Sequence, residues 1–186
     1  SFAQTFTGGY GLVVNGPYGS QQWMAEEYAE ELDALNSYPY SLDSAIAELE
    51  AGGWVYNEDG SDYSGSGIRY KQLDDGTYMP LIIEWCSSEN NSVSDLLVTT
   101  LQQNPDVAAA GMQINQTVVS YTELLPNYYD NSTENQYQMF NLATGFGNPY
   151  DVAYMYEPDS ASNVNALAGE EGQKLYDLAV AMNQTE

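Results

Sequence analysis

The residues that most often carry out catalysis are scarce in this chain. It contains no histidine and a single cysteine, Cys86. Ser-His and Cys-His arrangements and most zinc sites are therefore excluded. Cys86 ends an apolar segment typical of a buried strand, which favours a small core residue over a reactive thiol. Nucleophilic catalysis by the usual groups is not expected.

Carboxylates are the remaining candidates for chemistry. Paired acids could run a glycoside hydrolase, but 27 acidic residues produce many accidental pairs, and none is set in apolar surroundings. Residues 57–62, Asn-Glu-Asp-Gly-Ser-Asp, resemble the start of a calcium loop. Gly60, however, falls at the fourth place instead of the sixth, and Ile68 occupies the place of the bidentate glutamate. A solvated turn is the better interpretation.

A binding site is indicated where the predicted strands end. The segment Gly145-Phe-Gly-Asn-Pro follows the third predicted strand, and ligands of open α/β sheets gather beyond the carboxyl ends of strands. Trp85 ends another strand and could form an aromatic wall with Phe146, the alternatives being core packing and a plain turn. The candidate ligand-facing residues are Trp85, Thr144, Gly145, Phe146 and Asn148. No role is assigned to the abundant tyrosines, such as Tyr128, Tyr129, Tyr154 and Tyr156.

The elements that must position these residues alternate between helix and strand. Helical spacing of apolar residues or helix-capping residues predict helices at 20–35, 41–51, from 92 to about 101, 120–129 and 169–182. Extended segments are predicted at 68–73 and 78–86, as a hairpin around Asp74-Asp-Gly, and at 108–119 and 137–144. Strand-helix-strand order implies parallel pairing with right-handed crossovers. The predicted fold class is α/β, with a mixed β-sheet flanked by helices in three layers.

Charge and hydropathy exclude several kinds of partner. Three basic against 27 acidic residues give 3 − 27 = −24, so nucleic acids and anionic membranes are poor partners. No apolar run approaches the length of a membrane span, about 20 residues. The 186 residues fit one domain, and such a charge predicts a stability that depends on salt. No cofactor or metal is predicted.

Several motifs, in this order, resemble a known family. They are Gly8-Gly-Tyr-Gly, Val13-Val-Asn-Gly-Pro-Tyr-Gly, Ser41-Leu-Asp-Ser-Ala, Ala51-Gly-Gly-Trp-Val-Tyr-Asn-Glu-Asp-Gly, Gly67-Ile-Arg-Tyr-Lys, Met79-Pro-Leu-Ile-Ile-Glu-Trp, Gly111-Met-Gln-Ile-Asn, Tyr121-Thr-Glu-Leu-Leu and Tyr137-Gln-Met-Phe-Asn-Leu-Ala. Together they resemble the second, C-terminal ligand-binding lobe of the family 5 extracellular solute-binding proteins, which serve ABC importers of oligopeptides and dipeptides. The resemblance extends over nearly the whole chain.

The resemblance implies a type II periplasmic-binding-protein-like fold and a binding role without enzymatic activity. Residues 1–186 would be a single solute-binding lobe, excised from a larger two-lobed protein. That protein would be held by a lipid at the extracellular face of the bacterial cytoplasmic membrane and would deliver peptides to an ABC permease. In the family an aspartate after the last strand often pairs with the peptide amino group, but here its position falls on Gly145.

Other readings remain open. Asp151 could substitute for the missing aspartate, or the solute could be a nickel complex, haem or a sugar, as in relatives of the same fold. Two rival functions are a surface sensor or adhesin with the same fold, and a glycoside hydrolase with two carboxyl groups about 5–9.5 Å apart in one pocket.

Overall fold

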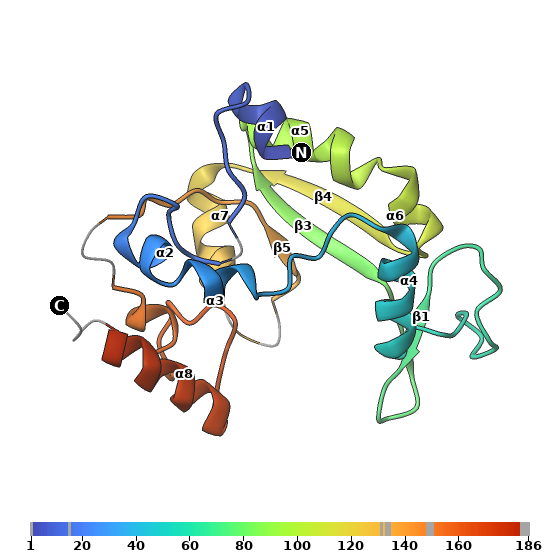
Figure 1. Cartoon of the computed structure of the whole chain (residues 1–186). Helices are drawn as coiled ribbons and strands as arrows, with labels where there is room; N and C mark the ends of the chain where they lie inside the picture. The colour runs from blue at the N-terminus through green and yellow to red at the C-terminus, as the bar shows by residue number, and fades with distance from the viewer. Residues whose placement is uncertain (1, 15, 131, 133–134, 148–150, 183–186) are drawn as a thin grey trace.

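A parallel sheet of three strands forms the centre of the chain in our computed structural model (Figure 1). The structure describes residues 2–14, 16–130, 132, 135–147 and 151–182. The strands are β3 (Ile82–Ser88), β4 (Gln113–Val119) and β5 (Met139–Phe140), in the order β4-β3-β5. The continuous apolar run of β3 makes it the middle strand, and its side chains at Trp85 and Cys86 have no solvent exposure.

Helical crossovers connect these strands, as predicted from strand-helix-strand order. The helix α5 (Ser92–Leu97), the π-helical turn η1 (Val98–Gln102) and α6 (Pro105–Ala109) lead from β3 to β4, and α7 (Tyr121–Tyr128) leads from β4 to β5. Each α-helix begins at a polar cap: the side chains of Asn91, Asn104 and Ser120 accept hydrogen bonds from backbone N–H groups of the first turn. Pairing of β3 with both neighbours is parallel, which confirms that prediction.

The predicted hairpin forms a second, smaller sheet. Strands β1 (Tyr70–Gln72) and β2 (Tyr78–Pro80) pair antiparallel, next to the helix α4 (Leu42–Ala51), which begins at Ser41 and ends at Gly52 as expected. The segment predicted as one strand, 78–86, divides at Leu81 into β2 and β3. Both kinds of strand pairing therefore occur, but in separate sheets.

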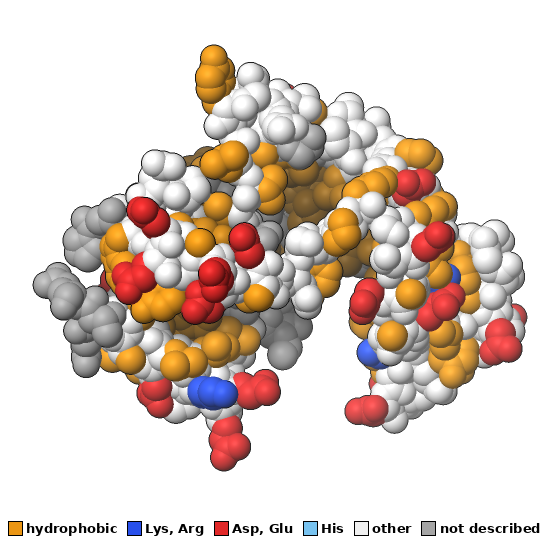
Figure 2. All heavy atoms as spheres, in the orientation of Figure 1, with side chains coloured by type: hydrophobic (Ala, Val, Ile, Leu, Met, Phe, Trp, Pro, Cys, Tyr) orange, Lys and Arg blue, Asp and Glu red, His pale blue; other side chains and the backbone are white. Residues whose placement is uncertain are grey.

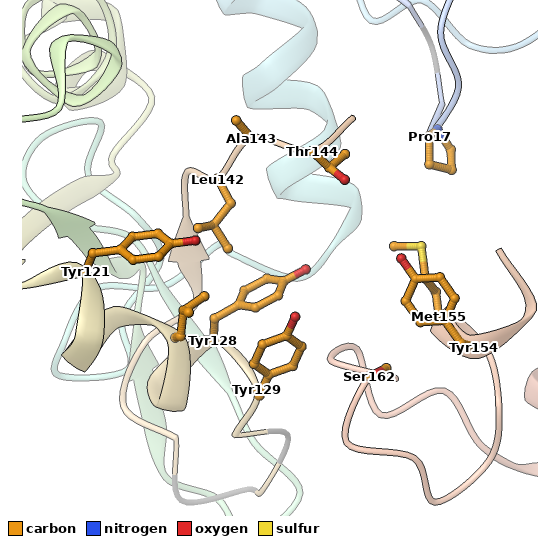
Figure 3. A pocket seen from close by; sticks show the side chains of 11 residues that line it. Pro17, Tyr121, Tyr128, Tyr129, Leu142, Ala143, Thr144, Tyr154, Met155 and Ser162 are labelled. Atoms are coloured by element: carbon orange, nitrogen blue, oxygen red, sulfur yellow. The ribbon is translucent and has the colours of Figure 1, made fainter. Parts of the chain in front are cut away.

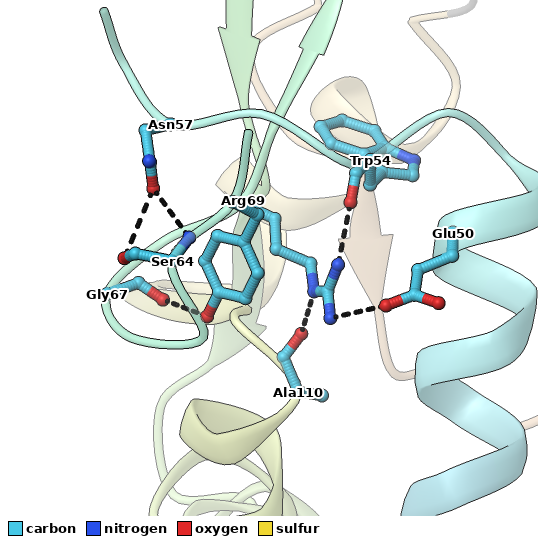
Figure 4. Close-up of polar contacts among 8 residues, drawn as sticks. Glu50, Trp54, Asn57, Ser64, Gly67, Arg69 and Ala110 are labelled. Atoms are coloured by element: carbon cyan, nitrogen blue, oxygen red, sulfur yellow. Dashed lines mark hydrogen bonds and ion pairs between the residues drawn. The ribbon is translucent and has the colours of Figure 1, made fainter. Parts of the chain in front are cut away.

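A buried arginine joins the hairpin unit, which consists of α4, β1 and β2, to the parallel sheet (Figure 4). Arg69 is 4% exposed, and its guanidinium donates to the carbonyl oxygens of Ala110 at 3.0 Å and Trp54 at 2.9 Å. It also pairs with Glu50 at 3.2 Å and lies 4.2 Å from the ring centre of Tyr63. One side chain thus binds α4, the loop after it and the chain that precedes β4.

The remaining helices lie away from the hairpin unit: the first is near α5, and most of the others gather at the opposite end of the molecule (Figure 1). They are α1 (Phe2–Thr7), α2 (Trp23–Glu27), α3 (Ala29–Asp33), the 3₁₀ turn η2 (Ala153–Met155) and α8 (Gly169–Met182). The single helix predicted at 20–35 is wrong in its middle, because Tyr28 leaves helical geometry at φ −110° and ψ 32°. None of the described helices is long and apolar enough to cross a membrane.

The bounds predicted for α8 are confirmed, and its apolar residues predict one packing face of Leu175, Leu178, Ala179 and Met182, which the structure confirms in part. Leu175 and Leu178 are 40% and 58% exposed. Ala179 is buried and packs with Val152 and Ala153 at η2, and Met182 packs against the same cluster, as predicted. Small residues on α8 let it approach this turn closely, which a count of large apolar side chains does not reveal.

Candidate functional site

A pocket of about 260 Å³ lies beside the chain that leaves β5 (Figure 3). Its walls come from the loop at Pro17, from α7, from the segment after β5 and from η2 with the loop that follows. The lining residues are Pro17, Tyr121, Leu125, Tyr128, Tyr129, Leu142, Ala143, Thr144, Tyr154, Met155 and Ser162. It therefore lies beyond the carboxyl end of a parallel strand, where ligands of α/β proteins bind.

The helix α7 supplies the aromatic wall of this pocket. Ser120 and Glu123 form a capping box that fixes where α7 begins. Leu124 has no solvent exposure and anchors the helix against the sheet. Tyr121, Leu125, Tyr128 and Tyr129 follow the helical repeat, which brings them to one side of α7 and into the pocket.

Tyr128 stands at the centre of a group of phenols. Its ring packs edge-to-face on Tyr129, with ring centres 5.0 Å apart, and on Phe140 of β5 at 5.6 Å. Burial raises the pKa of Tyr128, and the neighbouring Tyr129 and Tyr154 raise it further. The phenol of Tyr128 is therefore neutral at physiological pH.

Hydrogen bonds at two places fix the wall of the pocket that faces α7. The side chain of Asp151 accepts a hydrogen bond from the backbone N–H of Ala153 at 2.8 Å, at the start of the turn that carries Tyr154. Gln22, 4% exposed, accepts from the N–H of Gly19 at 2.8 Å and donates to the carbonyl of Gly147 at 2.6 Å. This bridge ties the loop of Pro17 to the segment after β5.

The structure places the predicted ligand-facing residues at different positions relative to the pocket. Thr144 lines the pocket, whereas Gly145 and Phe146 are exposed beside it and do not line it. Asn148 lies outside the described residues. Trp85 requires a correction: it has no solvent exposure, and its indole N–H donates to Asn141 at 3.0 Å, so it belongs to the core and is out of reach of a ligand.

Sequence reasoning missed the tyrosines that dominate the pocket. Tyr128, Tyr129 and Tyr154 were left without a role, yet all three line it. The helical spacing of Tyr121, Tyr128 and Tyr129 was the available signal, because it places three phenols on one side of a short helix. Nothing in the sequence indicated that Tyr154 would face them.

The site has no charged lining and no metal-binding cluster. No Asp, Glu, Lys or Arg is among the described residues that line the pocket. Within the described ranges no three His, Cys, Asp or Glu residues are grouped so as to hold a metal ion. Cys86 is buried, and burial raises the pKa of its thiol, so it remains a neutral core residue.

A second cavity of about 310 Å³ adjoins the first at Pro17. Its lining is almost wholly apolar and comes from the loop at Pro17, from α2 and α3, from the residues on either side of η2 and from the end of α8. The residues are Pro17, Tyr18, Met24, Tyr28, Leu32, Val152, Tyr156 and Met182.

Comparison with known proteins gives matches in structure only. No protein-family model matches the sequence, and no curated protein does. The crystal structure of NikA from Brucella suis, in complex with Fe(III)-EDTA, is 20% identical with a TM-score of 0.60, over 94% of this chain and 30% of that one. NikZ from Campylobacter jejuni, in complex with Ni(L-His), is 16% identical with a TM-score of 0.59, over 100% of this chain and 33% of that one.

A third match is the oligopeptide-binding protein AppA from Bacillus subtilis in complex with a nonapeptide, 16% identical with a TM-score of 0.54, over 81% of this chain and 29% of that one. The chain has a periplasmic-binding-protein-like α/β fold. It spans about a third of the length of the solved structures it matches. At these identities the likeness establishes the fold, and the predicted fold class is confirmed.

Proposed function

We propose that this chain is the C-terminal ligand-binding lobe of a family 5 extracellular solute-binding protein, which captures peptides and delivers them to an ABC permease. The observation that carries the proposal is the fold likeness, which covers 81–100% of this chain in binding proteins solved with a peptide or a metal complex. The pocket beyond β5 supports it, since it lies on the segment where ligand contact was expected. The intact protein would then be lipid-anchored outside the cell.

Peptides suit the site better than metal complexes do. The chain contains no histidine, and the described residues offer no metal-binding cluster. β5 is an edge strand, and residues 142–147 continue from it as exposed chain. An extended peptide can pair with exposed backbone of this kind, which gives affinity without demanding a particular side chain.

A carboxylate-based hydrolase is the weaker alternative. It requires two carboxyl groups facing one pocket, and neither of the two cavities is lined by a described aspartate or glutamate. We therefore infer a binding role without catalysis.

Native mass spectrometry of the protein encoded by the complete gene, purified from its host, tests the proposal. A ladder of bound peptides of mixed mass is the expected result. One defined non-peptide mass would keep solute binding but overturn the peptide assignment. If the native protein carried no solute and also bound no member of a peptide library, solute binding itself would be overturned.

A pair of variants connects that measurement to the pocket. Thr144→Trp places an indole in the lining, whereas Thr122→Trp adds the same group at an exposed position of α7 outside it. The first variant should carry less bound peptide than the native protein, and the second should carry the same amount. Equal loading of both would place the binding site elsewhere.

A further inference from the structure

The pocket beyond β5 combines aromatic rings with the absence of charge. Four of its eleven described lining residues are tyrosines, and Thr144 and Ser162 supply the other hydroxyl groups. None of the described lining residues has a side-chain amide, carboxylate or basic group. Carbohydrate sites depend on such amides and carboxylates to bind sugar hydroxyls, so this lining suits a sugar poorly.

The rings surround the cavity from two directions. Figure 3 shows Tyr128 and Tyr129 on one side and Tyr154 with Met155 on the other. Tyr129 and Tyr154 remain 47% and 50% exposed, so a ligand reaches them from solvent. Aromatic faces carry negative electrostatic potential, and a cage of several rings attracts a cation without any carboxylate.

The charge of the chain acts in the same direction. With a net charge of −24, the surface attracts cations and repels anions over distances comparable to the Debye length. Figure 2 shows acidic side chains over α2, α3 and α8 as well as over the hairpin unit, and Pro17 lines both the second cavity and the pocket beyond β5 (the tyrosine pocket). Arg69 pairs with Glu50 in the hairpin unit, and Lys71 lies on β1. α8 carries Lys174 beside Glu170, Glu171 and Asp177, so acidic residues still outnumber basic ones on this helix.

We propose that the tyrosine pocket binds the positively charged end of an organic cation, by cation–π contact with Tyr128, Tyr129 and Tyr154. The identity of the cation rests on the proposed function. If the solute is a peptide, the cation is a lysine or arginine side chain of that peptide. An open cage leaves the cation partly hydrated, which avoids the cost of burying it without an anionic partner.

Titration of the 186-residue chain with n-butylammonium, and with n-butanol as the neutral counterpart, tests the pocket directly. Ring signals of labelled tyrosines are followed by NMR. We expect the chemical-shift changes of the Tyr129 and Tyr154 rings to reach saturation with butylammonium. Butanol should reach half-saturation only at a several-fold higher concentration. Equal or tighter binding of butanol would overturn the proposal, because it would make the pocket a site for apolar or hydroxylic groups.

Substitutions separate the ring from its hydroxyl. Tyr129→Phe and Tyr154→Phe keep the ring and should bind butylammonium within about twofold of the native chain, whereas Tyr129→Leu and Tyr154→Leu should each bind about two- to fivefold more weakly. Tyr10→Leu is the matched control, at a residue that is 94% exposed and outside the pocket. Loss of binding in the Phe variants would show that the hydroxyl groups, and not the rings, bind the ligand.

A peptide pair keeps this proposal distinct from the proposed function. The protein from the complete gene is offered Ala-Lys-Ala and Ala-norleucine-Ala, which differ in one charged group. Binding of both with equal affinity would leave peptide binding standing and refute the cation site. Binding of butylammonium with no binding of either peptide would leave the cation site standing and refute peptide binding.

Discussion

Replacement of Arg69 by methionine should destabilise the fold strongly. Methionine keeps an unbranched stem of similar length but removes the guanidinium. The carbonyl groups of Ala110 and Trp54 then lose their donors, and Ala110 is only 5% exposed. An unsatisfied buried acceptor costs about 1–3 kcal/mol. For two carbonyls we expect a loss of about 2–4 kcal/mol in the free energy of unfolding.

The contact of Arg69 with Glu50 adds little to this sum, because the Glu50 side chain is 53% exposed and water screens the pair. Arg69→Lys should cause an intermediate loss, since one ammonium group cannot reproduce the planar fork that reaches both carbonyls. Lys71→Met on β1 is the matched control: it changes the net charge equally but should alter stability by less than about 0.5 kcal/mol.

Urea unfolding at constant salt, followed by far-UV circular dichroism, measures these differences. Hydrogen exchange locates them, because backbone N–H groups that bond across the hairpin unit, such as Tyr56 to Tyr70, should lose protection first in Arg69→Met. If Arg69→Met and Lys71→Met unfold at the same urea concentration, the arginine does not join the two sheets and the reasoning fails.

Three further predictions concern the core, the charge and the start of α7. Leu124→Ala should cost about 2–5 kcal/mol, because that side chain is fully buried, whereas Leu175→Ala, at a side chain 40% exposed, should cost less than about 0.5; equal losses in urea unfolding would contradict the packing described. Raising KCl at fixed pH should raise the urea midpoint, because salt screens repulsion within a chain of charge −24; a constant or falling midpoint would show that this repulsion does not limit stability. Hydrogen bonds from Ser120 lower the pKa of Glu123, so stabilisation by this carboxylate is complete above the pKa of an unfolded glutamate and is lost as pH falls through the lowered folded pKa. Ser120→Ala should raise the pKa of Glu123 toward its ordinary value in an NMR titration, and an unchanged midpoint would refute the capping box.

Local signals in the sequence predicted the parts of the fold that depend on neighbouring residues. Ser41 and the Gly52-Gly53 pair indicated both ends of α4, and the apolar run before Cys86 indicated a buried parallel strand. The packing of α8 depended instead on residues distant in sequence. Ala179 is buried against Val152 and Ala153 at η2. Hydrophobic periodicity placed Leu175, Leu178, Ala179 and Met182 on one face; Ala179 and Met182 pack as predicted, whereas Leu175 and Leu178 remain exposed.

The candidate site was harder to predict for the same reason. Thr144 lines the pocket as predicted, although β5 ends at Phe140 and the predicted strand extended to Thr144. Trp85 was misplaced because an aromatic residue at the end of a strand predicts a pocket wall and a core residue equally well. Its hydrogen-bond partner, Asn141, is 56 residues away, and that distant contact decides between them. The wall at Tyr154 depends in turn on η2 packing against α8.

Because the chain is strongly acidic, salt should raise the stability of the fold but lower the rate at which the pocket binds a cation. Added salt screens repulsion among the acidic side chains and should therefore stabilise the fold. The same salt shortens the distance over which these side chains attract a cation, from about 30 Å at 0.01 M to about 10 Å at 0.1 M, and so should slow cation capture. Contact between a cation and the tyrosine rings is short-range and should change less. If the tyrosine pocket is a cation site, the association rate for butylammonium should fall with KCl while the urea midpoint rises. A site that bound neutral groups would show only the rise in stability.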